Sequence, residues 1–121
     1  MINLETTYMG LKLKNPIVAG SSGLTNSINQ IKQLANAGVG AIVLKSLFEE
    51  QINGEISNLV NVSGQHNDYP EAEDYIKQYT RSNSIQKYLD LVKDAKSTVN
   101  VPIIASINCI TASDWVNFAK D

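Results

Sequence analysis

The sequence has few of the residues that stabilise secreted proteins or ligate metals. It contains one cysteine, Cys109, and one histidine, His66, in 121 residues. A single cysteine cannot form an intrachain disulfide, so a reducing cytoplasm is the expected setting. His66 has no second ligand or acid-base partner near it in sequence. We therefore assign it to a surface loop and expect no metal site.

The chain also lacks an excess of charge of one sign and any long apolar run. It carries 10 Lys and Arg against 12 Asp and Glu, a net charge of −2, which provides no basic field for nucleic acid or an anionic membrane. No run approaches the about 18 apolar residues of a membrane span, and the N-terminus lacks the features of a signal peptide. We expect a cytoplasmic protein with no nucleic-acid and no membrane partner.

What the sequence does contain is an α/β pattern built on three short apolar runs. These runs span residues 17–19, 41–44 and 103–107. They show no polar alternation, which indicates strands buried on both faces, as in parallel sheets. Upstream, the segments 4–8 and 11–14 flank a Met-Gly pair and predict an antiparallel β-hairpin.

Helical patterns separate the apolar runs. Apolar residues from Ile28 to Ala35 fall on one helical face, a cap is available among the three preceding polar residues, and Gly38 is a suitable stop. A second helix is predicted to begin after a cap at Ser84. A third begins at residues 111–114, which have the spacing of a capping box.

The segment from residue 51 to residue 83 shows no clear periodicity and is rich in Asn, Ser, Gly, Asp and Glu. A long loop inside a compact domain is usually functional or mobile, so we predict such a loop here. Glu49 and Glu50 precede it. Because adjacent carboxylates do not easily converge on one substrate, we interpret them as a solvated pair.

Three β–α units leave one face of a parallel sheet uncovered, and sheets open in this way are almost unknown. We therefore interpret residues 1–121 as one partial domain, most simply the N-terminal part of a (β/α)8 TIM barrel of about 250 residues. Ligands of such folds bind at the carboxyl ends of the strands. Lys45 and Ser46 end the second run and are the first candidates for a functional site. The alternative is a Lys45 side chain that extends into solvent.

Three stretches resemble the class 1 dihydroorotate dehydrogenases. Residues 6–23, Thr-Thr-Tyr-Met-Gly-Leu-Lys-Leu-Lys-Asn-Pro-Ile-Val-Ala-Gly-Ser-Ser-Gly, resemble their N-terminal hairpin and first barrel strand. Residues 37–46 resemble their second strand with its Lys-Ser pair, and residues 101–108 resemble their third. The sequence Leu-Phe-Glu-Glu-Gln-Ile at 47–52 is typical of the dihydroorotate dehydrogenase-like branch. The resemblance covers nearly the whole chain and the first third or so of a family member.

This resemblance implies an FMN-containing barrel that oxidises dihydroorotate to orotate in pyrimidine biosynthesis, with hydride transfer to FMN. The family's flavin-contacting positions correspond here to Gly20, Ser21, Lys45 and Ser46, and Asn108, at the end of the third strand, is a further candidate for an FMN or substrate contact. The resemblance further implies that Lys45 contacts the substrate region. An ammonium beside the flavin would stabilise the negative charge of the reduced ring.

The family's substrate loop, Asn-Ser-Met-Gly-Leu-Pro-Asn, corresponds here to residues 79–84, so Asn83 joins Lys45 as a candidate substrate-binding residue. The family's catalytic base follows the fourth strand, so we expect none before Asp121. Cys109 follows the third strand and is interpreted as a small, partly buried thiol. Barrels commonly bind phosphate with their last loops. We therefore expect that the 121-residue chain alone neither retains FMN nor turns over substrate.

Two other functions stay open at this point. In the first, Lys45 is the Schiff-base lysine of an aldolase-type barrel, which borohydride trapping of a substrate adduct would favour. In the second, the protein is a flavin-binding relative with a different substrate or no catalysis, because its substrate loop differs from that of the family. Turnover of dihydroorotate by the full-length protein separates the second from an active dehydrogenase. For the full-length protein we expect a homo-oligomer and a small-molecule substrate.

Overall fold

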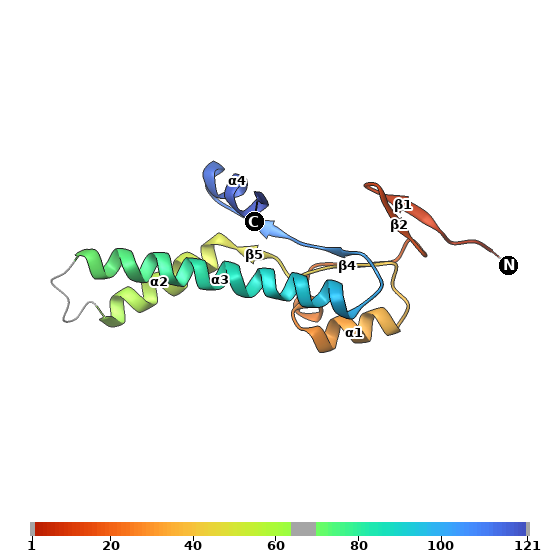
Figure 1. Cartoon of the computed structure of the whole chain (residues 1–121), viewed down its shortest axis with the longest axis horizontal. Coiled ribbons are helices and arrows are strands. Elements are labelled where there is room, and N and C mark those ends of the chain that lie inside the picture. Colours follow the sequence, from red (N-terminus) through yellow and green to blue (C-terminus); the bar gives the residue numbers. More distant parts are fainter. Residues whose placement is uncertain (1, 64–69, 121) are drawn as a thin grey trace. The chain divides into compact units, whose positions relative to one another are not determined.

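A computed structural model of the chain describes residues 2–63 and 70–120. Figure 1 shows the order of the elements along the chain. Contacts divide the chain into two compact units. The first unit is Met1–Ser46 with Asp90–Ser106, and the second is Leu47–Leu89 with Ile107–Asp121. His66, predicted to occupy a surface loop, lies outside the described residues.

The first unit begins with the expected β-hairpin. Strands β1 (Thr6–Tyr8) and β2 (Leu11–Leu13) pair antiparallel. The two residues between them, Met9 and Gly10, have φ angles of 47° and 81°. Two consecutive left-handed residues form the turn whose twist matches a two-residue hairpin.

A parallel sheet follows, in the strand order β3 (Val18–Ala19), β4 (Ala41–Val43), β6 (Ile103–Ile104). The parallel pairing of the three predicted runs is confirmed. The central strand is buried, and Ile42 is 0% exposed. The prediction that the first run is buried is wrong, since Ile17 is 63% exposed. The reason is that β3 is an edge strand of the described sheet, with β4 as its neighbour.

The predicted helix between β3 and β4 is present as α1 (Ile28–Asn36). Ser27 occupies the N-cap position, and the one fully buried side chain of the helix is Ile31. Gly38 ends the helix with a φ of 97°, and its N–H donates to the carbonyl of Ala35. A glycine in the left-handed region after the last turn is a common helix stop, as predicted.

The starts of β3 and β4 are fixed by Asn15. Its Nδ2 donates to the carbonyl of Gly38 at 2.8 Å, and its Oδ1 accepts from the N–H of Ile17 at 3.0 Å. The N–H of Gly40 donates to the carbonyl of Ile17 at 2.7 Å. A Cβ atom on Gly40 would lie 2.1 Å from the backbone oxygen of Asn15. Only glycine therefore fits at this crossing.

The loop predicted for residues 51–83 is wrong for all its described residues. They form α2 (Glu49–Ser63) and the first part of α3 (Pro70–Thr98), a helix that continues into the first unit (Figure 1). Ser84 consequently lies within α3 and is not a cap. The helical signal was carried by three apolar residues at every fourth position, Ile52, Ile56 and Val60, in a largely polar segment.

The second unit contains a further parallel pair, β5 (Leu47–Phe48) with β7 (Ile107–Asn108). The predicted single run 103–107 is therefore two strands, β6 and β7, interrupted at Ala105 and Ser106. Helix α4 (Ala112–Lys120) follows. The core of the unit comprises Ile52, Ile56, Cys109 and Phe118, against which Leu47, Val60, Ile85 and Ile107 pack. Among the described residues, no helix combines the length and apolar character that crossing a membrane requires.

Candidate functional site

In the first unit, polar residues follow each strand of the parallel sheet. Ser21 lies two residues after β3, Lys45 and Ser46 lie just after β4, and Ser106 lies two residues after β6. Because parallel strands end at the same edge of a sheet, these positions gather at its carboxyl edge. This is the edge at which ligands of α/β folds bind.

Three serines are joined there by hydrogen bonds. The N–H of Ser46 donates to Oγ of Ser21 at 3.0 Å, and the two hydroxyl oxygens lie 3.2 Å apart. Oγ of Ser46 lies 2.6 Å from Oγ of Ser106. We call Ser21, Ser46 and Ser106 the serine cluster. The cluster links the loops after all three strands, and Ser46 is at its centre.

The backbone of Lys45 is held by the loop after β3. Its N–H donates to the carbonyl of Thr25 at 3.3 Å, and Thr25 is fully buried. The hydroxyl of Thr25 donates to the carbonyl of Ser22 and accepts from its N–H, which closes the turn. Lys45 is half-buried and forms no ion pair with any residue in 2–63 or 70–120. A partly desolvated ammonium of this kind favours an anionic or electron-rich ligand.

Gly20 directly follows β3 and is exposed. A Cβ atom there would meet nothing within 4 Å among the described residues. The described residues therefore do not require glycine at this position, and its small size leaves room beside Ser21 for a ligand.

The two remaining predicted residues belong to the second unit. Asn108 is the exposed last residue of β7 and is paired in register with Phe48. Asn83 is exposed within α3, so it lies on a helix and not in the predicted substrate loop. The structure thus brings Ser21 and Ser46 into contact. Gly20 and Lys45 directly precede these two residues in the sequence.

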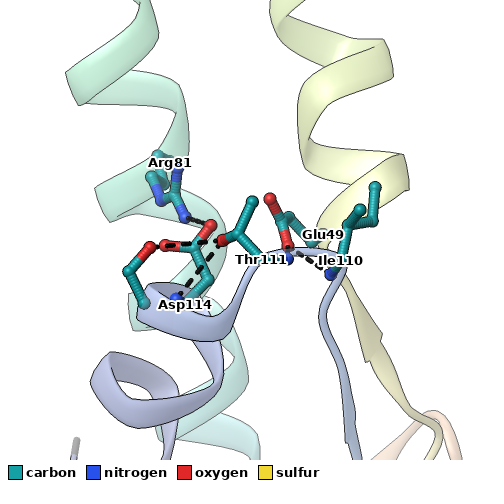
Figure 2. A network of polar contacts seen from close by, with 6 residues as sticks. Glu49, Arg81, Ile110, Thr111 and Asp114 are labelled. Carbon is teal, nitrogen blue, oxygen red and sulfur yellow. Dashed lines mark hydrogen bonds and ion pairs between the residues drawn. The ribbon is translucent and has the colours of Figure 1, made fainter.

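A second group of polar contacts lies in the second unit (Figure 2). Glu49 is 4% exposed, and its Oε2 accepts from the N–H groups of Ile110 at 2.6 Å and Thr111 at 3.2 Å. These two residues directly precede α4, and backbone donors at a helix N-terminus lack helical partners. The prediction of a solvated Glu49–Glu50 pair is therefore wrong for Glu49, whereas Glu50 is exposed.

An ion pair joins α3 to α4 in the same group. Arg81 pairs with Asp114 (Figure 2). The guanidinium carbon of Arg81 lies 5.5 Å from the ring centre of Phe118. The hydrogen bond from Arg81 outweighs desolvation and holds the pKa of Asp114 below its usual value. Burial raises the pKa of the Cys109 thiol, and the nearby carboxylates of Glu49 and Asp114 raise it further. Cys109, expected to be a partly buried thiol, is buried.

Sequence reasoning missed Ser106, Glu49 and Arg81. For Ser106 a signal exists, because this serine interrupts the apolar run at residues 103–107. Arg81 lay in a segment predicted to be a loop. The contact of Glu49 with Ile110 spans 61 residues, and no local pattern identifies such a pair.

The first unit is thus an α/β structure with hydroxyl groups and a lysine at the carboxyl edge of a parallel sheet, the arrangement of ligand sites in α/β enzymes. The chain is similar to the catalytic subunit of dihydroorotate dehydrogenase B (NAD(+)) from Thermoplasma acidophilum, with 26% identity over 121 residues. The alignment covers 99% of this chain and 37% of that relative. No family model matches the chain, and no solved structure matches it significantly. The similarity supports a distant relationship to a dihydroorotate dehydrogenase.

Proposed function

We propose that the full-length protein is an FMN-dependent oxidoreductase of the class 1 dihydroorotate dehydrogenase type. In this proposal β3, β4 and β6 are the first three strands of a (β/α)8 barrel. The observation that carries the proposal is the grouping of the serine cluster and Lys45 at the carboxyl edge of the sheet. The similarity of nearly the whole chain to a dihydroorotate dehydrogenase supports it.

The donor set at this edge fits a flavin. The pyrimidine edge of an isoalloxazine ring carries carbonyl oxygens and the N1 nitrogen, which accept hydrogen bonds, and an N3–H group, which donates one. Serine hydroxyls and a lysine ammonium can donate to these acceptors, and a serine hydroxyl can also accept from N3–H. Bound FMN supplies the hydride acceptor that oxidation of a dihydropyrimidine needs. The donors of this edge thus match the acceptors of a flavin. The residues proposed to hold FMN here are Gly20, Ser21, Lys45 and Ser46.

Lys45 has two roles in this proposal. Its ammonium stabilises the negative charge that a flavin acquires on reduction, because the described residues provide no carboxylate that neutralises it. It also faces the substrate region. In the second unit, Asn108 is proposed as a further FMN contact and Asn83 as a substrate contact, and both side chains are exposed.

The test is the colour and activity of the full-length protein. We expect it to purify with a flavin absorbance band and to release FMN on denaturation. Dihydroorotate should be oxidised when fumarate, a quinone or NAD is offered in turn. A colourless protein that takes up no added FMN would contradict the proposal.

A flavin-binding relative with another substrate is the second candidate, and the placement of Asn83 on a helix favours it. This candidate predicts a yellow protein that does not oxidise dihydroorotate. An aldolase-type use of Lys45 has less support, because no carboxylate of the described residues pairs with this lysine. Borohydride trapping on Lys45 distinguishes it.

A further inference from the structure

We infer that Ser106 is a positioning residue, which fixes the direction in which the Ser46 hydroxyl meets a ligand. The inference deepens the proposed function and depends on it for the identity of the ligand. Ser106 follows β6, whereas Ser46 follows β4. The contact between their hydroxyl oxygens, at 2.6 Å, is the shortest in the serine cluster.

The argument starts from the bonding capacity of a serine hydroxyl. The oxygen has one hydrogen and two lone pairs, so three positions are available around it besides its Cβ atom. In Ser46 two of these positions are used, one by the contact with Ser21 at 3.2 Å and one by the contact with Ser106 at 2.6 Å. One position is left for a ligand. Because the oxygen is tetrahedral, the two occupied positions determine where the third points.

The backbone of Ser46 is fixed independently of Ser106. Its N–H donates to Oγ of Ser21, and the preceding N–H of Lys45 donates to the carbonyl of Thr25. Loss of the Ser106 hydroxyl therefore leaves the Ser46 backbone in place. It frees the Ser46 side chain to rotate, and a freely rotating donor binds a ligand less well than a pre-oriented one. The expected defect is one of ligand geometry and not of folding.

The experiment measures the dissociation constant of FMN and the visible spectrum of bound FMN in the full-length protein. We expect Ser106→Ala to raise the dissociation constant about tenfold, the size of one well-placed hydrogen bond, and to shift the flavin spectrum. Ser106→Thr keeps the hydroxyl and should restore most of the affinity. Ser97→Ala is the matched control, because the Ser97 hydroxyl donates to a helix carbonyl, that of Asp94.

A double-mutant cycle shows whether Ser106 acts through Ser46. The variant carrying both Ser46→Ala and Ser106→Ala should bind FMN within about twofold of Ser46→Ala alone, because Ser106 then has nothing to orient. Fully additive effects would overturn the inference, since Ser106 would then act on the ligand by itself. An unchanged dissociation constant in Ser106→Ala would overturn it as well.

The side-chain rotamer of Ser46 separates this inference from the proposed function. If the unmodified protein binds no FMN, the proposed function fails, and the χ1 scalar couplings of Ser46, measured by NMR, then test the positioning role alone. Couplings averaged over several rotamers in Ser106→Ala, with a single rotamer kept in Ser97→Ala, would support that role, and the same single rotamer in both variants would overturn it. If Ser106→Ala does not fold, Ser106→Thr and Ser106→Cys carry the same comparison. The threonine variant should then bind FMN more tightly than the cysteine variant, and equal affinities would overturn the inference.

Discussion

At the scale of single residues, Gly40 is a position at which the fold leaves no room for a side chain. A methyl group there would lie 2.1 Å from the backbone oxygen of Asn15, and a backbone atom cannot rotate away. We expect Gly40→Ala to lower the free energy of unfolding by about 1–3 kcal/mol, measured by urea denaturation. Gly54→Ala is the control, because a Cβ at this position in α2 meets nothing within 4 Å. It should raise stability by up to about 1 kcal/mol.

The same comparison can refute the geometry at Gly40. If Gly40→Ala and Gly54→Ala have equal effects on the free energy of unfolding, the close approach of Asn15 and Gly40 does not exist in solution. The register between the starts of β3 and β4 would then need another explanation.

The lowered pKa of Asp114 leads to a prediction of how the free energy of unfolding depends on pH. Its pKa is held below the ordinary 3.8, chiefly by the hydrogen bond from Arg81. A carboxylate with a lowered folded-state pKa stabilises the fold above its unfolded pKa, and this contribution is lost as the pH falls through the folded-state pKa. The stability difference between the wild type and Asp114→Asn should therefore be constant near neutral pH. It should shrink below about pH 4.

Urea unfolding at a series of pH values measures this difference. Asp94→Asn is the control, because the described residues give the Asp94 side chain no ion pair and no hydrogen bond. A wild-type advantage over Asp114→Asn that stayed constant through the acid range would show that the Arg81–Asp114 pair does not form in the folded state.

At the scale of elements, the packing of the second unit depends on the buried face of α2, which carries Ile52 and Ile56. Ile52 is 3% exposed and lies in the core with Phe118 and Cys109. We expect Ile52→Ala to cost about 2–5 kcal/mol of unfolding free energy, from lost burial and the cavity that remains. Val62→Ala, in the same helix but 83% exposed, should change stability by less than about 0.5 kcal/mol. Similar costs for both variants would mean that α2 does not present this face to the core.

The elements that could be predicted from the sequence are those with local signals. The hairpin has its Met9-Gly10 turn, α1 has Gly38 as its stop, and the central run of the sheet is continuously apolar. The helices α2 and the first part of α3 were missed because their buried residues are few and widely spaced among polar ones. The interruption between β6 and β7 was missed because the bond of Ser106 to Ser46 spans 60 residues.

The residues of the candidate site divide in the same way into those with a local sequence signal and those without one. Lys45 and Ser46 could be predicted because this pair directly follows the apolar run 41–44, and Ser21 because it stands in a small-residue loop. The partners that hold them could not, since they come from other strands. The contact of Ser21 with Ser46 joins residues 25 apart in sequence. Contacts of this length depend on strand pairing, which single-sequence patterns do not report.

At the scale of the whole molecule, the described residues form part of a larger barrel only under the proposed function. The chain spans 37% of the length of the dihydroorotate dehydrogenase subunit that it matches. The proposed function is therefore a statement about the full-length protein. In that proposal the carboxyl edge of β3, β4 and β6 contributes hydroxyl groups and one ammonium, and further residues of the full-length protein would hold the phosphate of FMN.

The most direct test of this account is the dissociation constant of FMN for the full-length protein and for Lys45→Met, measured by flavin fluorescence. Lys77→Met is the control, because Lys77 is exposed on α3 and pairs with Glu73. We predict that the wild type and Lys77→Met bind FMN equally, and that Lys45→Met binds at least about tenfold more weakly, the loss expected of a charged hydrogen bond. Equal binding by all three proteins, or no binding by the wild type, would contradict the account.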